Sequence, residues 1–251
     1  MNFKIRISIL LVLVFMSFTE SRLTNDFKSD QKKYSRVNDA YKIKETVINK
    51  YLVDAGLDLS TLHIVIKAVK YDKKLYVYGK DKTHQHYKLL VSYDFCTSSG
   101  KLGPKRQSGD GQIPEGFYYI DRFNPQSTFH LSLGINYPNT SDKKLTKHSN
   151  PGGDIFIHGD CVTIGCIPIT DDKIKELYIL AVEARNNGQL KIPVYIFPIE
   201  FNKIRKNEYI LGYNPENDKF WNNLRKGYDY FETHKKLPQV NVGEDGYYEF
   251  K

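Results

Sequence analysis

The hydrophobic positions of the chain follow a helical period first and strand-like runs afterwards. Between Val37 and Ala55 the apolar residues fall largely on one face of a helix, and Gly56 is typical of a helix end. Short runs rich in β-branched and aromatic residues follow, each bounded by polar turns. They predict strands at LHIVIKAV, KLYVYG, YKLLVSY, GFYYI, FHLSLGINYPN and DIFIHGD.

The last third of the chain predicts two further helices with a strand between them. Thr170 suits an N-cap, two aspartates follow it where the helix dipole favours negative charge, and Gly188 suits the helix end. IPVYIFPIEF then returns as a strand. A final amphipathic helix, packed against the main body, is predicted by the positions Phe220, Trp221, Leu224, Tyr228 and Phe231.

The amino terminus has the layout of a secretory signal peptide. Lys4 and Arg6 precede an apolar run from Ile7 to Phe18, and small polar residues follow it. The run is shorter than the roughly 20 residues that a membrane-spanning helix needs. An uncleaved amino-terminal anchor is the alternative interpretation. Either way, we expect the body of the protein to be exported to the periplasm or the cell envelope.

The composition is that of a globular protein with a positive charge balance. The 251 residues have a net charge of +8, which favours polyanionic surroundings such as nucleic acid, acidic wall polymers or membrane surfaces. The lysines are scattered, and they form no arginine-rich cluster or known nucleic-acid motif. We therefore expect no nucleic-acid partner.

Three cysteines, Cys96, Cys161 and Cys166, give the chain an odd number of thiols. Outside the cytoplasm thiols tend to be oxidised in pairs, so at least one of the three is left unpaired. Two of them lie together with His158 in the stretch IHGDCVTIGCIP. This stretch has three interpretations: a metal site, a Cys161–Cys166 disulfide, or a nucleophile with its base.

The first two interpretations explain little of the stretch. The spacing His-x2-Cys-x4-Cys does not match the paired cysteine knuckle of zinc sites, so we expect neither a metal nor a cofactor. A Cys161–Cys166 disulfide would close a very small loop and leave Cys96 as the odd thiol. It would explain neither the histidine at the strand end nor the glycine before Cys166.

The nucleophile interpretation accounts for more of these residues. A thiol attacks as its thiolate, and a nearby histidine produces the thiolate by taking the proton. His158 stands at the end of a predicted buried strand, which aims it with little loss of entropy. Gly165 lets the backbone approach a reacting carbonyl, so that the amides of Gly165 and Cys166 would bind an oxyanion. For His158 taken alone, a hydrogen-bonded core histidine is the alternative.

These residues resemble the motif of the L,D-transpeptidase catalytic domain family, also called YkuD-like, and within it the YafK-like branch. The family's hallmark is a strand ending in His-Gly, a loop, then Ser/Thr-x-Gly-Cys and an apolar residue. His158-Gly159 and the run from Thr163 to Ile167 match it. The resemblance covers roughly residues 45–250 and includes GDGQIPEGFYYI, LHIVIKAVKYDKKLYVY, SGKLGPK, INYPN and FWNNLRKGYDYF.

The resemblance implies an α+β fold that is mainly β, a YkuD-like β-sandwich of mixed sheets with flanking helices. It implies that Cys166 attacks the carbonyl of the third residue of a peptidoglycan stem peptide, at its link to a D-amino acid, and forms a thioester. His158 would act as base and later as acid. An amine acceptor or a wall-attached protein would then be a further partner. Hydrolysis, as an amidase or L,D-carboxypeptidase, is the alternative, and a non-catalytic wall-binding module is another.

The chain divides into four segments on this basis. The boundaries follow changes of composition, with polar and charged residues after the signal and a polar, aromatic composition near the carboxy terminus. We predict a signal peptide (1–22), a polar tether (23–44), the L,D-transpeptidase-like catalytic domain (45–200) and a C-terminal helical extension packed on it (201–251).

The chain departs from the family pattern beside the motif. Cys166 follows His158 by only eight positions, whereas the family has a longer loop. Ile164 stands where the family commonly has His or Lys, and Pro168 where it has Arg or Asn. Because proline cannot bind a carboxylate as arginine does, the hydrolytic alternative gains weight.

The resemblance also assigns the three cysteines. Only Cys166 fits the position of the nucleophile. A Cys96–Cys161 disulfide would use the two other thiols in an oxidising compartment and leave Cys166 free. Two small buried free cysteines are the alternative, because sequence alone does not fix connectivity.

Overall fold

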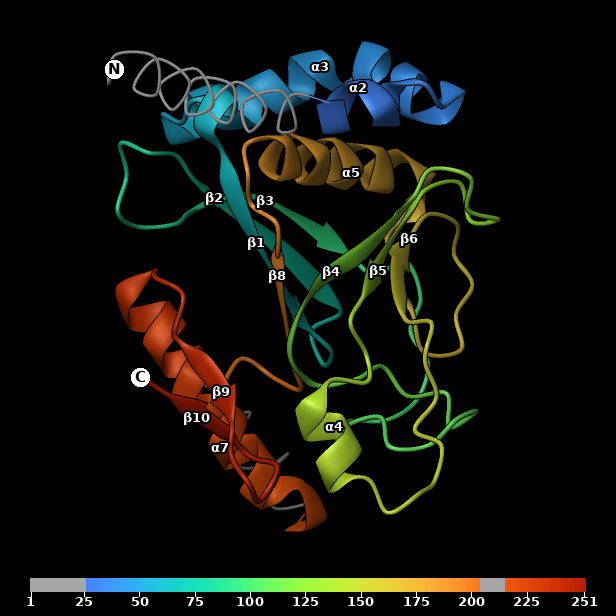
Figure 1. Cartoon of the computed structure of the whole chain (residues 1–251), viewed down its shortest axis with the longest axis vertical. Helices are drawn as coiled ribbons and strands as arrows, with labels where there is room; N and C mark the ends of the chain where they lie inside the picture. Colours follow the sequence, from blue (N-terminus) through green and yellow to red (C-terminus); the bar gives the residue numbers. More distant parts are fainter. Residues whose placement is uncertain (1–25, 204–214) are drawn as a thin grey trace, which may run out of the picture.

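The computed structural model describes residues 26–203 and 215–251, which form a curled sheet with helices on both sides (Figure 1). The predicted signal peptide, residues 1–22, lies outside the described ranges. Within those ranges no helix combines the length and the apolar character needed to cross a bilayer.

The strands form one continuous mixed sheet in the order β3-β2-β1-β8-β4-β5-β6-β7. Strand β1 is antiparallel to β2 and parallel to β8, whereas β4 pairs with β8 on one side and β5 on the other. The predicted α+β class is confirmed. The mixed sheets expected from the sequence are two halves of one continuous sheet, joined at β4. The strands are β1 (His63–Val69), β2 (Lys74–Lys80), β3 (Lys88–Asp94), β4 (Gly116–Asn124), β5 (Ser132–Ile135), β6 (Phe156–His158), β7 (Ile167–Pro168) and β8 (Pro193–Phe197).

The helices lie in two groups. In Figure 1, α5 lies between the α2–α3 pair and the sheet, while α7 and the β9–β10 hairpin lie on the other side. Their bounds are α2 (Asp26–Lys32), α3 (Ser35–Ala55), the 3-10 turn η1 (Leu59–Thr61), α4 (Thr140–Leu145), α5 (Thr170–Asn186), α7 (Pro215–His234), β9 (Val240–Val242) and β10 (Tyr248–Phe250).

Residues 26–44 correct the prediction of a polar tether. They are helical, and Val37 and Ala40 are fully buried against the rest of the protein. The Arg36 guanidinium donates a hydrogen bond to the Ser127 carbonyl at 2.6 Å. Their polar composition suggested a tether because only one narrow face of these helices is buried, and most of the other positions are exposed and polar. Helix α3 ends where predicted, with Gly56 in the left-handed conformation at φ 63°.

Strand β1 lies at the centre of two hydrophobic clusters, one on each face of the sheet. Ile64 and Ile66 belong to the cluster under α3 and α5, whereas Val65 between them belongs to the cluster under α7. A strand covered on both faces has a near-continuous hydrophobic sequence, which is why LHIVIKAV shows no polar alternation. The second cluster is aromatic and includes the five residues that predicted α7, namely Phe220, Trp221, Leu224, Tyr228 and Phe231.

A buried ion pair joins the end of β1 to the segment before β4. Lys70 Nζ lies 2.9 Å from Glu115 Oε1 and also donates to the carbonyls of Gly103 and Ile113. Glu115 accepts in turn from the Gly103 amide at 2.8 Å and from the indole N–H of Trp221 in α7 at 2.7 Å. Burial lowers the pKa of Lys70, and the Glu115 carboxylate opposes that effect. Every charged atom of the pair therefore has partners.

Removal of one partner of this pair should destabilise the protein strongly. We expect Glu115→Ala to lower the free energy of unfolding by about 3–5 kcal/mol, because it leaves a buried ammonium uncompensated. Asp94→Ala is the matched control, since it breaks the exposed Lys74–Asp94 pair (2.6 Å). That variant should change stability by about 1 kcal/mol or less. Urea unfolding measures both, and equal losses would contradict this assignment.

Candidate active site

His158 ends strand β6, in the middle of the last three strands of the sheet. It pairs with Ser132 of β5 on one side and with Pro168 of β7 on the other. The residue is buried, and its ring stacks on Phe129 with the ring centres 4.5 Å apart. This packing fixes the direction of the imidazole.

The carbonyl oxygen of Gly159 fixes the tautomer of the ring. Nδ1 of His158 forms a short hydrogen bond with this oxygen, and a carbonyl only accepts, so Nδ1 is the donor. The neutral imidazole therefore carries its proton on Nδ1 and presents Nε2 as the basic nitrogen. A backbone carbonyl here orients the histidine, as a carboxylate does in Ser-His-Asp triads.

Only glycine fits after this histidine because backbone atoms crowd the position. The Gly159 amide donates to the carbonyls of Phe129 at 3.1 Å and Leu131 at 3.2 Å. A Cβ on Gly159 would lie 2.7 Å from the Phe129 oxygen. The His-Gly pair therefore anchors the end of β6 and places the carbonyl that orients His158.

Cys166 immediately precedes β7 and is partly buried beside β6. Its Sγ accepts a hydrogen bond from the Phe156 amide at 3.4 Å. Phe156 and His158 are two residues apart on one strand, so their side chains share a face of the sheet. The parallel pairing of β6 with β7 thus brings the two predicted residues to the same strand pair. Among the hydrogen bonds of the described residues, none joins Cys166 to His158 directly.

The loop between the two residues is held at several points. The structure joins Cys96 to Cys161 by a disulfide with Cα atoms 5.5 Å apart and leaves Cys166 as a free thiol. The Cys96 amide donates to the Pro168 carbonyl at 3.0 Å, and the Asp160 amide donates to Asp171 of α5 at 2.7 Å. From the sequence, Asp171 was expected only to interact with the helix dipole, because no local pattern indicates its contact with the Asp160 amide.

Thr163 sets the backbone around the thiol. Its hydroxyl donates to the Cys166 carbonyl at 2.8 Å and accepts from the Gly165 amide at 3.1 Å. Of the two amides predicted for an oxyanion hole, that of Gly165 is therefore occupied, whereas that of Cys166 has no hydrogen bond within the described residues. Gly165 has φ 133°, and a Cβ there would lie 3.0 Å from the Gln112 carbonyl, so only glycine fits.

Electrostatics favour a neutral pair in the free protein. Burial raises the pKa of the Cys166 thiol, with Asp154 adding to the effect and the Phe156 amide and Lys105 opposing it. Burial also lowers the pKa of His158 below its ordinary value. Both shifts oppose a resting thiolate–imidazolium pair. His158 is therefore suited to take the thiol proton as attack occurs, as a general base.

The two departures from the family motif differ in their surroundings. Ile164 is 87% exposed on the loop, whereas Pro168 is buried in β7. Neither side chain offers a hydrogen-bond donor near the thiol. Among residues 26–203 and 215–251, no group of three His, Cys, Asp or Glu side chains is arranged to hold a metal ion.

Comparison with known proteins identifies the family. The family model described as the L,D-transpeptidase catalytic domain, YkuD, matches residues 63–196. The chain belongs to this family. It is also 36% identical over 181 residues to "Putative L,D-transpeptidase YafK" of Escherichia coli strain K12. The aligned part covers 71% of this chain and 70% of that protein. The same identity and coverage hold for the protein of that name in Escherichia coli O157:H7.

Solved structures show lower similarity to this YkuD-family chain. The helical cell shape determining protein Pgp2 from Campylobacter jejuni is 17% identical, with a TM-score of 0.44, covering 78% of this chain and 80% of that one. Bd1075 from Bdellovibrio bacteriovorus is 20% identical, with a TM-score of 0.41, covering 77% of this chain and 86% of that one.

The shifted pKa values predict how Cys166 reacts with an alkylating agent. Iodoacetamide should label Cys166 slowly at pH 7, with a rate that rises through a midpoint above 9.0, because burial raises the pKa of the reacting thiol. The His158→Ala variant should keep this midpoint, since no ion pair is lost. Mass spectrometry of the labelled peptide gives the rates. A plateau of reactivity between about pH 5 and 7 that His158→Ala lacks would instead indicate a resting ion pair.

Loss of the Cys96–Cys161 disulfide should lower the stability of the protein, whereas loss of the free thiol of Cys166 should not. We expect the double variant Cys96→Ser/Cys161→Ser to lose about 2–4 kcal/mol of unfolding free energy, because the bond ties distant segments together. Cys166→Ser should unfold within about 1 kcal/mol of the wild type, being a partly exposed small residue. Denaturant unfolding under non-reducing conditions compares them. Peptide mapping that finds Cys166 in a disulfide would contradict the pairing.

Proposed function

We propose that this protein is an exported cysteine acyl-transfer enzyme that acts on peptidoglycan stem peptides through a thioester on Cys166. The observation that carries the proposal is the placement of the motif in a member of this family. One free thiol stands beside β6, and at the end of β6 the Gly159 carbonyl holds His158 with Nε2 available as a base.

The chemistry that follows needs only these groups. The thiol proton passes to His158 Nε2 as Sγ attacks the carbonyl carbon of the stem peptide, and the Cys166 amide faces the developing oxyanion. The proton then passes to the departing amine, which leaves a thioester on Cys166. An amine acceptor or water attacks the thioester, loses its proton to Nε2, and the thiol is regenerated.

Export to the periplasm or cell envelope belongs to the same proposal. The amino-terminal sequence pattern supports it, and so does the Cys96–Cys161 disulfide, because structural disulfides persist in oxidising compartments. The net charge of +8 suits an acidic cell-wall surrounding.

The test is incubation of the full chain with purified muropeptides, followed by mass analysis. We expect turnover that Cys166→Ala abolishes and that His158→Ala lowers by at least about 100-fold, the contribution of a general base. Because burial lowers the pKa of His158, kcat/KM should rise with pH through a midpoint below about 6.5. Added chelator should leave the rate unchanged.

The products decide the acceptor. A new cross-linked dimer indicates transfer to an amine, whereas loss of a terminal residue or of an attached protein indicates hydrolysis as a carboxypeptidase or amidase. A stable acyl adduct on Cys166 in the presence of substrate would establish the thioester in either case. Turnover by Cys166→Ala, or absence of both turnover and adduct with every muropeptide, would reject the enzymatic proposal and favour a wall-binding module.

A further inference from the structure

A cavity of about 770 Å³ is lined in part by the segment from Leu102 to Gln112, which also reaches the loop that carries Cys166. Gln112 lines the cavity, while its carbonyl would lie 3.0 Å from a Cβ placed on Gly165. Gln112 therefore lies next to both the cavity and the residue that precedes Cys166. The volume is that of sites which hold a ligand of several residues or one drug-sized molecule.

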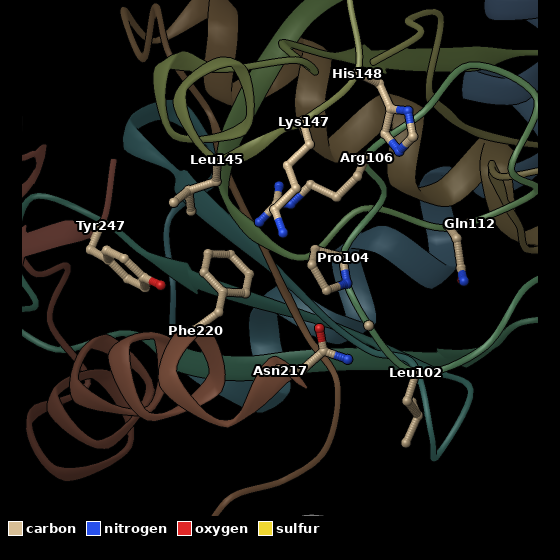
Figure 2. Close-up of a pocket in the computed structure, with 11 residues that line it drawn as sticks. Leu102, Pro104, Arg106, Gln112, Leu145, Lys147, His148, Asn217, Phe220 and Tyr247 are labelled. Atoms are coloured by element: carbon tan, nitrogen blue, oxygen red, sulfur yellow. The ribbon is translucent and has the colours of Figure 1, made fainter. Parts of the chain in front are cut away.

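The cavity lining is basic. Arg106, Lys147 and His148 line it, and no carboxylate side chain does so among the described residues. Figure 2 shows the side chains of Arg106 and Lys147 directed toward the middle of the cavity, near Phe220. In the described part of the chain, the Lys147 ammonium has no ion pair or hydrogen bond. The amides of Gln112 and Asn217 add neutral donors at the rim.

Arg106 is fixed in place but keeps free donors. Its Nη1 lies 2.9 Å from the buried carboxylate of Asp142, and its guanidinium lies 4.8 Å from the ring centre of Phe220. Nε and Nη2 make no hydrogen bond to the described residues. Asp142 offsets part of the guanidinium charge, so Lys147 supplies the uncompensated positive charge of the cavity. A planar guanidinium with free N–H groups suits a carboxylate.

The other side of the cavity comes from the carboxy-terminal segment, beyond the residues 63–196 that match the family model. Asn217 and Phe220 of α7 and Tyr247 before β10 all line it. Trp221 fixes this part of α7 through its hydrogen bond to Glu115. The cavity is therefore built jointly by the catalytic domain and the segment that follows it.

We propose that this cavity binds a carboxylate of the peptide whose carbonyl reacts with Cys166, and that Lys147 and Arg106 position it. The inference rests on the proposed function, since it takes a stem peptide as substrate. Such a peptide has two sources of this group: the terminal carboxylate of the leaving D-amino acid, and a side-chain carboxylate on the third residue. The two share one recognition chemistry, and the experiment separates them.

The experiment measures binding, so that it does not depend on turnover. The full chain carrying Cys166→Ala is titrated calorimetrically with three synthetic stem tetrapeptides. The first has both carboxylates, the second has its carboxy terminus amidated, and the third has lysine at its third residue. Lys147→Gln should raise Kd about five- to tenfold for the first peptide, as expected for loss of one charged contact in a partly open site.

The matched control is Lys143→Gln. It removes the same charge from an exposed position of α4 that does not line the cavity, and Kd should stay unchanged. If the bound group is the terminal carboxylate, the amidated peptide should be insensitive to Lys147→Gln while the lysine peptide stays sensitive. The reverse pattern assigns the side-chain carboxylate.

Three results would overturn the inference: equal Kd changes for the Lys147 and Lys143 variants, sensitivity of both modified peptides that matches that of the parent, or no binding of the parent peptide at millimolar concentration. The proposed function fails separately, on the absence of a Cys166 adduct and of turnover. Turnover by the wild type with no effect of Lys147→Gln on Kd or KM would keep the enzyme and reject the cavity.

Discussion

The ion pair between Lys70 and Glu115 connects the end of β1, the segment before β4 and helix α7. Lys70 immediately follows β1, a strand that is buried on both faces. Its ammonium also donates to the carbonyls of Gly103 and Ile113, which bracket the segment that contributes Pro104, Arg106 and Gln112 to the neighbouring cavity. Glu115 extends the same network to Trp221 of α7. The position of the carboxy-terminal helix and of the active-site wall therefore depends on one fully satisfied pair of charges.

The candidate catalytic pair depends on a different constraint, the short parallel pairing of β6 with β7. That pairing places Cys166 beside Phe156, which is two residues before His158 on β6. The Gly159 carbonyl and the Phe129 ring fix the orientation of the imidazole. Burial keeps the thiol protonated and the histidine neutral. A thiol held in its protonated form is a weak nucleophile at rest, so the geometry around it, rather than a standing thiolate, would have to promote attack.

The sequence predicted those features whose causes are local. The end of α3 at Gly56, the strands of the sheet other than β7, and the aromatic face of α7 follow from periodicity over a few residues. His158 and Cys166 could be identified because their motif is contiguous. Features that join distant residues were missed. No sequence pattern indicates three of these contacts. They are the hydrogen bond from the Gly165 amide to the Thr163 hydroxyl, the hydrogen bond from the Asp160 amide to Asp171, and the Lys70–Glu115 ion pair. Residues 26–36 were misjudged as a tether because α2 and the first turn of α3 are polar in composition, and the predicted apolar period begins only at Val37.

The candidate chemistry and the neighbouring cavity are encoded differently along the chain. The nucleophile, its base and the loop between them fall within one contiguous stretch, from His158 to Pro168. The cavity draws on residues from Leu102 to Tyr247, including a carboxy-terminal segment outside the matched family domain. Substitutions in α7 or in the turn before β10 can therefore change the shape and charge of the cavity while every residue of the His158–Pro168 stretch stays the same.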